Sequence, residues 1–374
     1  MGKASALTFS LIMVKQFPKA NHVNSTWHSD AQIFFHANLS VREVREENMS
    51  SWKAIIAPKK KLHGIDDELQ KLLDANMDDV AARRRARAAF KGIQLSIDHI
   101  LFKTPSNGLK IEEQWCVIVM AMETPAHFSS KARIARKFAL LGYSVFAMDY
   151  PGFGLSEGLH GFIPNFDRIV DDVIEHYSKV KENPAFSALP SFLFGQSLGG
   201  AVALKIHLKQ PRSWGGAVLV APMCKISDDM IPPWGVSQVL IGASKFLPKY
   251  KLVPQKDLAE AAFRDLKYRE MTTYNVIAYK HKPRLQTAVE MLRTTQELER
   301  RLREVSLPIL ILHGEADTVT DPSVSKALYE KSSSTDRKLI LYEEAWHSLL
   351  EGEPDEIIVQ VLDDIISWMD ERCK

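Results

Sequence analysis

The chain has little that would place it among membrane, nucleic-acid-binding or metal-binding proteins. No apolar run approaches the roughly 18 residues of a membrane-spanning helix, so we expect a soluble or peripherally bound protein. Its 48 basic and 46 acidic residues leave a net charge of +2, which predicts no binding to nucleic acid. The three cysteines among its 374 residues have no Cys-x-x-Cys spacing and no nearby histidine pair. Their pattern argues against a disulfide framework and a zinc site.

A Gly-x-Ser-x-Gly motif lies at Gly195–Gly199, directly after the apolar run Phe192–Phe194 and directly before the helical pattern Ala201–Ile206. An apolar strand, a tight turn and a helix form the context of a nucleophile elbow. Glycines without a Cβ let the chain turn sharply enough to lift the hydroxyl of Ser197 above a sheet. We predict that Ser197 is a nucleophile and that the N–H of Leu198 is an oxyanion donor. The alternative is a glycine-serine turn without chemistry.

Strand patterns alternate with helical patterns along most of the chain. Apolar runs typical of buried strands lie at 115–121, 143–148, 192–194, 217–220, 307–312 and 338–342. Two further strand patterns, at 93–102 and 109–111, are typical of sheet edges. The alternation predicts the α/β class, with a mostly parallel central sheet and helices on both faces.

An acid and a base follow later strands. Asp317 lies just past the strand at 307–312, and His347 follows the strand at 338–342. A serine hydroxyl needs a base to take its proton, and the base needs a carboxylate to hold its tautomer. The chain order Ser197, Asp317, His347 is that of α/β-hydrolase triads, so we predict these three as the catalytic residues. Other candidates are interpreted as structural: His313, His207, Asp321 as a helix N-cap, and Asp149 as a brace for its loop.

About eighty residues separate the strand that ends near 220 from the strand that begins near 307, whereas a usual connection has roughly 2–6. This stretch is apolar and partly helical. It is either a lid that shelters a fatty acyl chain and contacts lipid, or a packed helical subdomain. We divide the chain into an N-terminal extension (1–60), a first core part (61–224), a cap (225–304) and a second core part (305–374).

Five segments together resemble the monoacylglycerol lipase group of α/β hydrolases. The resemblance is greatest to plant members, which include caffeoylshikimate esterases and lysophospholipase-like enzymes. The match runs from about Asp66 to the C-terminus and is carried by Asp149–Ser156, Gly195–Gly200, Ala221–Ile226, His313–Asp317 and Trp346–His347.

The resemblance implies an α/β-hydrolase fold with a helical cap, and it gives the triad roles to Ser197, Asp317 and His347. The implied substrates are carboxylic esters such as monoacylglycerols, lysophospholipids or phenolic esters, with no cofactor and no metal. Two alternatives stay open. One is an impaired hydrolase that only binds its ligand. The other is an acyltransferase, although the chain contains no His-x-x-x-x-Asp.

The first 29 residues contain three lysines and no acidic residue. This composition is typical of an organelle transit peptide, and an unstructured tail is the alternative. We therefore expect a chloroplast location, or otherwise a cytoplasmic or peripheral membrane one. The basic run Arg83–Arg87 is interpreted as the solvated face of a helix.

The resemblance fails at one stretch. The family carries His-Gly-Tyr-Gly after the strand that here is 116–120, and the backbone of that motif supplies the second oxyanion donor. This chain has Val-Met-Ala-Met-Glu-Thr-Pro at 119–125 instead. Ala121 and Met122 are therefore the candidates for the second donor, and an incomplete oxyanion hole would lower activity by about 10²–10³.

A change of reading frame accounts for this stretch. Synonymous codons for residues 119–132 can be chosen, beginning GTC ATG GCT ATG GAG ACA CCT, and then translated in the frame that starts at the third base. They then give His-Gly-Tyr-Gly-Asp-Thr-Cys-Thr-Phe-Phe-Phe-Glu-Gly, which is the sequence of the family. We infer a frame shift or an altered splice junction over residues 114–132. The fold should survive it, because 116–120 is still apolar enough to form a strand.

Sequencing of the transcripts tests this inference. We expect a second splice form whose frame encodes His-Gly-Tyr-Gly at this place. A single in-frame message that encodes Val119, Met120 and Ala121, with no alternative form, would contradict it.

Overall fold

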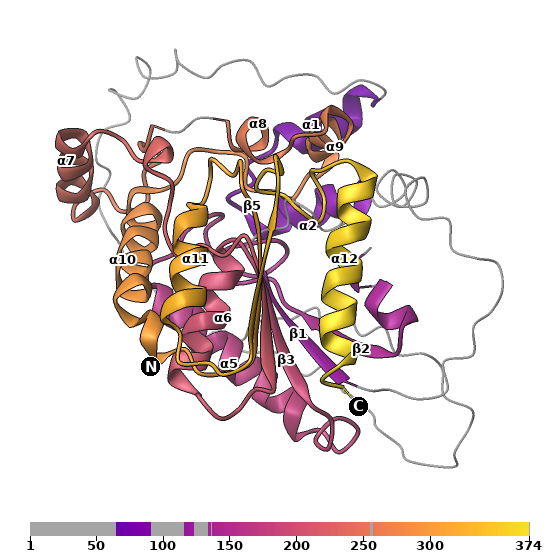
Figure 1. The fold of residues 1–374 in the computed structure, drawn as a ribbon. Coiled ribbons are helices and arrows are strands. Elements are labelled where there is room, and N and C mark those ends of the chain that lie inside the picture. The colour runs from indigo at the N-terminus through magenta and orange to yellow at the C-terminus, as the bar shows by residue number, and fades with distance from the viewer. Residues whose placement is uncertain (1–64, 91–115, 123–133, 136, 255–256, 374) are drawn as a thin grey trace, which may run out of the picture. The chain divides into compact units, whose positions relative to one another are not determined.

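Six parallel strands form the central sheet of the described residues (Figure 1). The computed structural model describes residues 65–90, 116–122, 134–135, 137–254 and 257–373. The predictions for the N-terminal extension and for the edge strands lie outside these residues. The strands lie in the spatial order β2 (Tyr143–Ala147), β1 (Cys116–Met122), β3 (Ser191–Gln196), β4 (Gly216–Val220), β5 (Ile309–Gly314) and β6 (Arg337–Tyr342).

Every neighbouring pair in this sheet is parallel, as the alternation of strands and helices predicts. The order reverses once, between β1 and β3, because the chain first adds β2 on one side of β1 and then continues on the other side. In open α/β sheets, ligands bind beyond the carboxyl ends of the strands at such a switch point. The switch point here lies at the carboxyl end of β3, where the serine motif begins.

Helices cover both faces of the sheet (Figure 1). They are α1 (Asp67–Asp74), α2 (Val80–Ala89), α5 (Phe166–Glu182), α6 (Leu198–Lys209), α7 (Trp234–Ser244), α8 (Leu258–Ala262), α9 (Leu266–Met271), α10 (Leu285–Arg301), α11 (Pro322–Lys331) and α12 (Asp355–Asp370), with short 3-10 turns η4 (Asp228–Met230), η5 (Thr272–Tyr274) and η6 (Leu302–Glu304). Helices α5, α6 and α11 lie on one face, and α12 lies on the other.

The buried side chains alternate between the two faces along each central strand, as a strand period of two requires. Leu193, Leu219 and Ile311 belong to the cluster that includes α5, α6 and α11. Phe194 and Leu310, their neighbours along the strands, belong to the cluster that includes α12. Because both faces are covered, the strands are continuous apolar runs rather than alternating ones.

Local capping signals in the sequence determine where several helices begin. The carboxylate of Asp321 accepts the N–H of Ser323 at 2.8 Å, and Pro322 occupies the first turn of α11. Asp321 is therefore a helix cap, as predicted. Asn165 caps α5 in the same way by accepting the N–H of Arg168.

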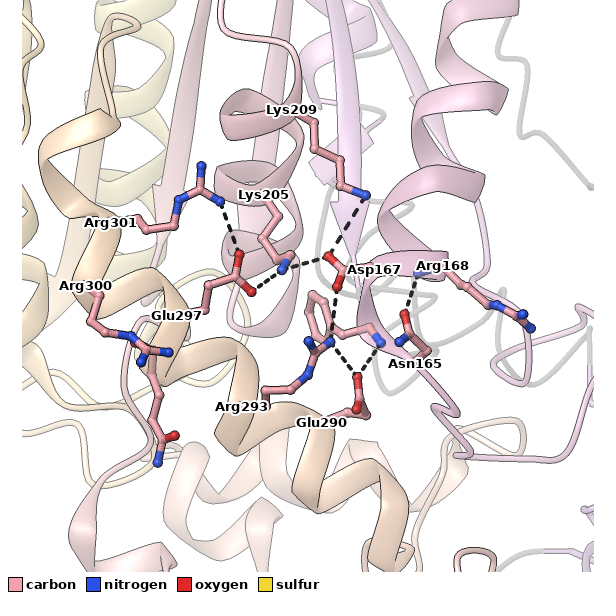
Figure 2. A network of polar contacts seen from close by, with 12 residues as sticks. Asn165, Asp167, Arg168, Lys205, Lys209, Glu290, Arg293, Glu297, Arg300 and Arg301 are labelled. Atoms are coloured by element: carbon pink, nitrogen blue, oxygen red, sulfur yellow. Dashed lines mark hydrogen bonds and ion pairs between the residues drawn. The ribbon is translucent and has the colours of Figure 1, made fainter.

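The chain between β4 and β5, residues 221–308, is called the insertion here and holds α7 to α10. Figure 2 shows a polar network that fastens α10 to α5 and α6. Lys205 of α6 is 3% exposed, and its ammonium lies 2.8 Å from Asp167 of α5 and 2.6 Å from Glu297 of α10. Arg293 bridges Asp167 and Glu290 at 3.1 and 3.0 Å. One face of α10 is thereby tied to the helix that follows the serine motif.

The interpretation of the basic run on α2 as a solvated face is wrong for Arg83. Arg83 is completely buried, and its guanidinium donates to the carbonyls of Gly154, Ser156 and Met77 at 2.7, 2.8 and 2.8 Å. The side chain of Arg85, in contrast, is 63% exposed. Arg83 is a structural link because a planar guanidinium can satisfy several carbonyls at once.

The cysteines also differ in part from the expectation. Cys224 is a buried free thiol, and burial raises its pKa to about 12. Cys373, which follows α12, is disulfide-bonded. An odd number of cysteines argued against a disulfide framework, but it did not exclude a single bond.

Replacement of Lys205 by alanine tests the network in Figure 2. The change removes the cation that Asp167 and Glu297 share, while Arg293 still binds Asp167 and Arg301 still binds Glu297. We therefore expect a loss of about 2 kcal/mol in the free energy of unfolding. Urea unfolding measures it. The control is Lys71→Ala, whose ion pair with Glu68 is mostly exposed, with an expected loss below about 0.5 kcal/mol. Equal losses in the two variants would contradict the importance of the network.

Candidate active site

The turn that carries Ser197 is strained, and the glycines around it make it sterically possible. Ser197 has φ 54° and ψ −123° between the end of β3 and the start of α6. A Cβ on Gly195 would collide with the backbone of Gly199, and a Cβ on Gly200 would collide with Pro222. Backbone strain of this kind is typical of functional sites. The predicted strand, turn and helix are therefore present at this motif.

The structure brings Ser197, His347 and Asp317 into one hydrogen-bonded chain. The Ser197 Oγ lies 2.9 Å from the His347 Nε2, and the His347 Nδ1 lies 2.7 Å from the Asp317 Oδ2. The three residues follow the carboxyl ends of β3, β6 and β5. Parallel strands place those ends at the same edge of the sheet, which is why residues 150 positions apart meet.

The carboxylate of Asp317 is buried and surrounded by donors. Its Oδ1 accepts the N–H groups of Val319 and Thr320 at 2.7 and 3.0 Å. Its Oδ2 lies 3.0 Å from the His313 Nε2 and accepts the Thr320 hydroxyl at 2.7 Å. Burial opposes ionisation, but the charge of His347 and the hydrogen bonds from His313 and His347 outweigh it. They hold the pKa of Asp317 well below its usual range.

Two partners of this carboxylate were missed by the sequence reasoning. His313 was interpreted as structural only, yet its ring lies between Asp317 and the hydroxyl of Ser325, which is 2.7 Å from its Nδ1. The Thr320 hydroxyl lies between the Asp317 Oδ2 and the His347 Nδ1, at 2.7 and 3.2 Å. Both residues lie within four positions of Asp317, and this proximity in sequence to the predicted acid is the signal that identifies them.

The predicted oxyanion residues lie at the same edge of the sheet. Leu198 is buried and is the first residue of α6, where the backbone N–H groups form the positive end of the helix dipole. Ala121 and Met122 end β1 and pair in register with Gly195 and Gln196. The strand predicted at 115–121 is thus confirmed as β1. Residues 114–115 and 123–132 of the stretch that departs from the family lie outside the described residues.

The remaining candidates have structural contacts. The Asp149 carboxylate accepts the N–H of Leu155 at 3.0 Å and so braces its own loop, as predicted. The His207 Nε2 accepts the N–H of Ser306 at 3.0 Å. Neither contact involves the Ser197 hydroxyl.

Ser197 lies in the wall of an apolar cavity whose mouth opens to solvent. Its wall is formed largely by the insertion, including α7 and the face of α10 that is opposite the polar network. Leu240, Ile241, Leu285, Val289 and Leu292 are typical lining residues. Ser237 and Thr320 are the hydroxyl-bearing residues of the wall besides Ser197. Such a surface can hold an aliphatic chain but offers few hydrogen-bond partners.

Fold and site together define an α/β hydrolase, with a serine, histidine and aspartate at the carboxyl ends of a parallel sheet. The family model described as serine aminopeptidase, S33, matches residues 117–355. The chain therefore belongs to this Hydrolase_4 family and is a carboxylic ester hydrolase.

Named relatives agree with this assignment. Caffeoylshikimate esterase of Arabidopsis thaliana is 35% identical over 246 residues, which are 65% of this chain and 73% of the relative. Monoglyceride lipase of Mus musculus is 28% identical over 250 residues, 66% and 79% of the two chains. A solved soluble variant of Saccharomyces cerevisiae monoglyceride lipase, in complex with a substrate analog, has a TM-score of 0.64 at 18% identity. It covers 72% of this chain and 90% of its own. That structure shows the same fold.

The low pKa of Asp317 predicts a pH-dependent stability. A depressed folded pKa stabilises the native state above the ordinary aspartate value near 4, and this stabilisation is lost as pH falls toward the folded value. We expect Asp317→Asn to flatten the loss of unfolding free energy below about pH 4. Urea unfolding from pH 7 to pH 2 measures the slope. The exposed Asp229→Asn variant is the control, and equal slopes in wild type and Asp317→Asn would contradict the prediction.

Proposed function

We propose that this chain hydrolyses monoacylglycerols or related long-chain carboxylic esters through a Ser197, His347 and Asp317 triad. The observation that carries the proposal is the chain of contacts at 2.9 and 2.7 Å that ends at an apolar cavity. The Ser197 hydroxyl, at the end of this series of hydrogen bonds, faces the space where an acyl group would lie.

The reaction follows from these contacts. The His347 Nε2 takes the Ser197 proton while the Ser197 Oγ bonds to the ester carbonyl carbon, which forms a tetrahedral oxyanion. The intermediate collapses as His347 returns the proton to the leaving alcohol, so the acyl group stays on Ser197. A water molecule then gives a proton to His347 and attacks the acyl carbonyl carbon. His347 returns that proton to the Ser197 Oγ as the carbon–oxygen bond to Ser197 breaks, which releases the carboxylic acid and regenerates the triad. Asp317 stays ionised throughout and stabilises the imidazolium.

Stabilisation of the oxyanion is the second part of the proposal. The Leu198 N–H at the start of α6 is the first donor, and the end of β1 at Ala121 and Met122 is the region of the second. Because the His-Gly-Tyr-Gly sequence is replaced here, we expect activity about 10²–10³ below that of a form with a complete hole.

The lining of the cavity favours an acyl chain over a phenolic acid. A phenol hydroxyl buried without a partner loses its hydrogen bonds to water. Among the described lining residues, the hydroxyls besides that of Ser197 are those of Ser237 and Thr320, which already donate to the Pro232 carbonyl and the Asp317 carboxylate. A phenolic ester is the second candidate, because the caffeoylshikimate esterase relative is 35% identical.

The cap assignment for residues 225–304 and a contact with lipid belong to the same proposal. Trp234 and Val239 of α7 are 80% and 71% exposed, and Phe246 just after this helix is 86% exposed. Exposed apolar side chains of this size fit a surface that rests on lipid, where an insoluble substrate would be met. Within the described part of the chain, no helix combines the length and apolar character needed to cross a membrane. The chloroplast location is also a proposal, since the first 29 residues lie outside the described part.

Release of oleate from monoolein tests the function. We expect the wild-type chain to release oleate and Ser197→Ala to fall to background, since loss of a triad serine removes about 10⁶ of kcat. Ser213→Ala, which changes an exposed serine, should keep wild-type activity. Equal rates for wild type and Ser197→Ala would reject the enzyme and leave the ligand-binding alternative.

A panel of monoolein, a lysophospholipid and a caffeoyl ester under one assay condition then ranks the substrates. The apolar cavity predicts the highest kcat/KM for monoolein. A higher value for the caffeoyl ester would favour the second candidate.

A further inference from the structure

The loop that carries His347 is fastened to the insertion on both sides of this residue. The N–H of Ser348, directly after His347, donates to the carbonyl of Ala262 at 3.0 Å. The N–H of Asp265 donates to the carbonyl of Gly352 at 2.8 Å. Residues 262–265, between α8 and α9, therefore run along the loop between β6 and α12.

Arg264 adds side-chain contacts to the same loop. Its Nη1 donates to the carbonyl of Glu344 at 3.1 Å, and its Nη2 lies 3.2 Å from the Glu344 carboxylate. Glu344 has φ 56°, in the left-handed region that a non-glycine residue adopts at a cost. A guanidinium that binds both the carbonyl and the carboxylate of Glu344 stabilises this turn, three residues before His347.

Glu353 holds the residue directly before His347. Its side chain is 0% exposed, and its Oε1 accepts the N–H of Trp346 at 2.6 Å. The Arg264 Nη1 lies 3.6 Å from the Glu353 Oε2. Burial raises the pKa of Glu353, and the Trp346 N–H and the Arg264 guanidinium oppose that rise. A carboxylate is costly to bury, and here its hydrogen bond is made to the backbone next to His347.

The loop has no room to shift toward the sheet. A Cβ on Gly314, at the end of β5, would collide with the carbonyls of Ala345 and Trp346. The N–H of Ala316 donates to the carbonyl of Ala345 at 3.0 Å. The end of β5 therefore contacts the loop directly, in addition to the contacts from the insertion and Glu353.

We propose that Glu353 and Arg264 are positioning residues for His347, so that the insertion sets the placement of the base as well as the wall of the cavity. The inference rests on the proposed role of His347. Helix α8 contacts both the cavity and the loop that carries His347. Leu258 at its start lines the cavity, and the carbonyl of Ala262 at its end accepts the N–H of Ser348.

Kinetics of three variants test the proposal, with kcat and KM measured for monoolein and for a short p-nitrophenyl ester. Glu353→Ala removes the acceptor for Trp346, and a misplacement of His347 by about 1 Å should lower kcat about 10²-fold for both esters at unchanged KM. Glu353→Gln keeps an amide oxygen as acceptor and should restore most of kcat. Arg264→Ala should lower kcat about tenfold, since the contacts of its guanidinium with Glu344 and Glu353 are lost while the hydrogen bond from Trp346 to Glu353 remains. Glu343→Ala, an exposed carboxylate on the same loop, is the control.

A second measurement separates this proposal from the proposed function. The rate at which a fluorophosphonate labels Ser197 depends on the base and needs no ester substrate. If wild type labels but hydrolyses no ester, the proposed substrate is wrong while the effect of the variants on labelling still tests the positioning. If Glu353→Ala does not fold by circular dichroism, Glu353→Gln and Arg264→Ala carry the test.

Four results would overturn the positioning role. They are wild-type kcat and labelling in Glu353→Ala or Arg264→Ala, a loss that Glu353→Gln does not restore, a change in KM alone, and an equal loss in Glu343→Ala.

Discussion

The rest of the site depends on the hydrogen bonds that the carboxylate of Asp317 accepts. A buried charge is stable only when its oxygens are satisfied, and Asp317 receives two backbone N–H groups besides the contacts with His313, Thr320 and His347. These donors hold the carboxylate at the end of β5. Its Oδ2 thereby orients the ring of His347, whose other nitrogen then lies within reach of Ser197.

Helix α10 connects the wall of the cavity to α6, the helix that follows Ser197. The polar face of this helix binds α5 and α6 through the network around Lys205, while its apolar face lines the cavity. Helix α6 begins at the residue after Ser197. The wall that would contact an acyl chain is therefore fixed to the helix that follows the proposed nucleophile. Helix α7, which carries exposed apolar side chains, forms no ion pair among the described contacts.

Strand β1 illustrates why a changed stretch of sequence can keep a fold and still affect chemistry. A buried strand requires apolar residues and backbone pairing, and the residues of β1 pair with both β2 and β3. An oxyanion loop requires particular backbone N–H directions, which glycines allow and bulkier residues restrict. We therefore expect the replacement to be tolerated at Ile118 and to affect the proposed oxyanion donors where the strand ends, at Ala121 and Met122.

The sequence alone determined the parallel α/β class, the elbow around Ser197, the cap at Asp321 and the order of the three proposed catalytic residues. These features follow from local periodicity, turn chemistry and strand ends. Tertiary structure alone decided that Arg83 is buried against residues some seventy positions away, that His313 shares the carboxylate of Asp317, and that Glu353 supports the residue before His347. Such contacts depend on which loops and helices pack together at one edge of the sheet. No local pattern encodes them, because the same residue types are equally at home in solvent.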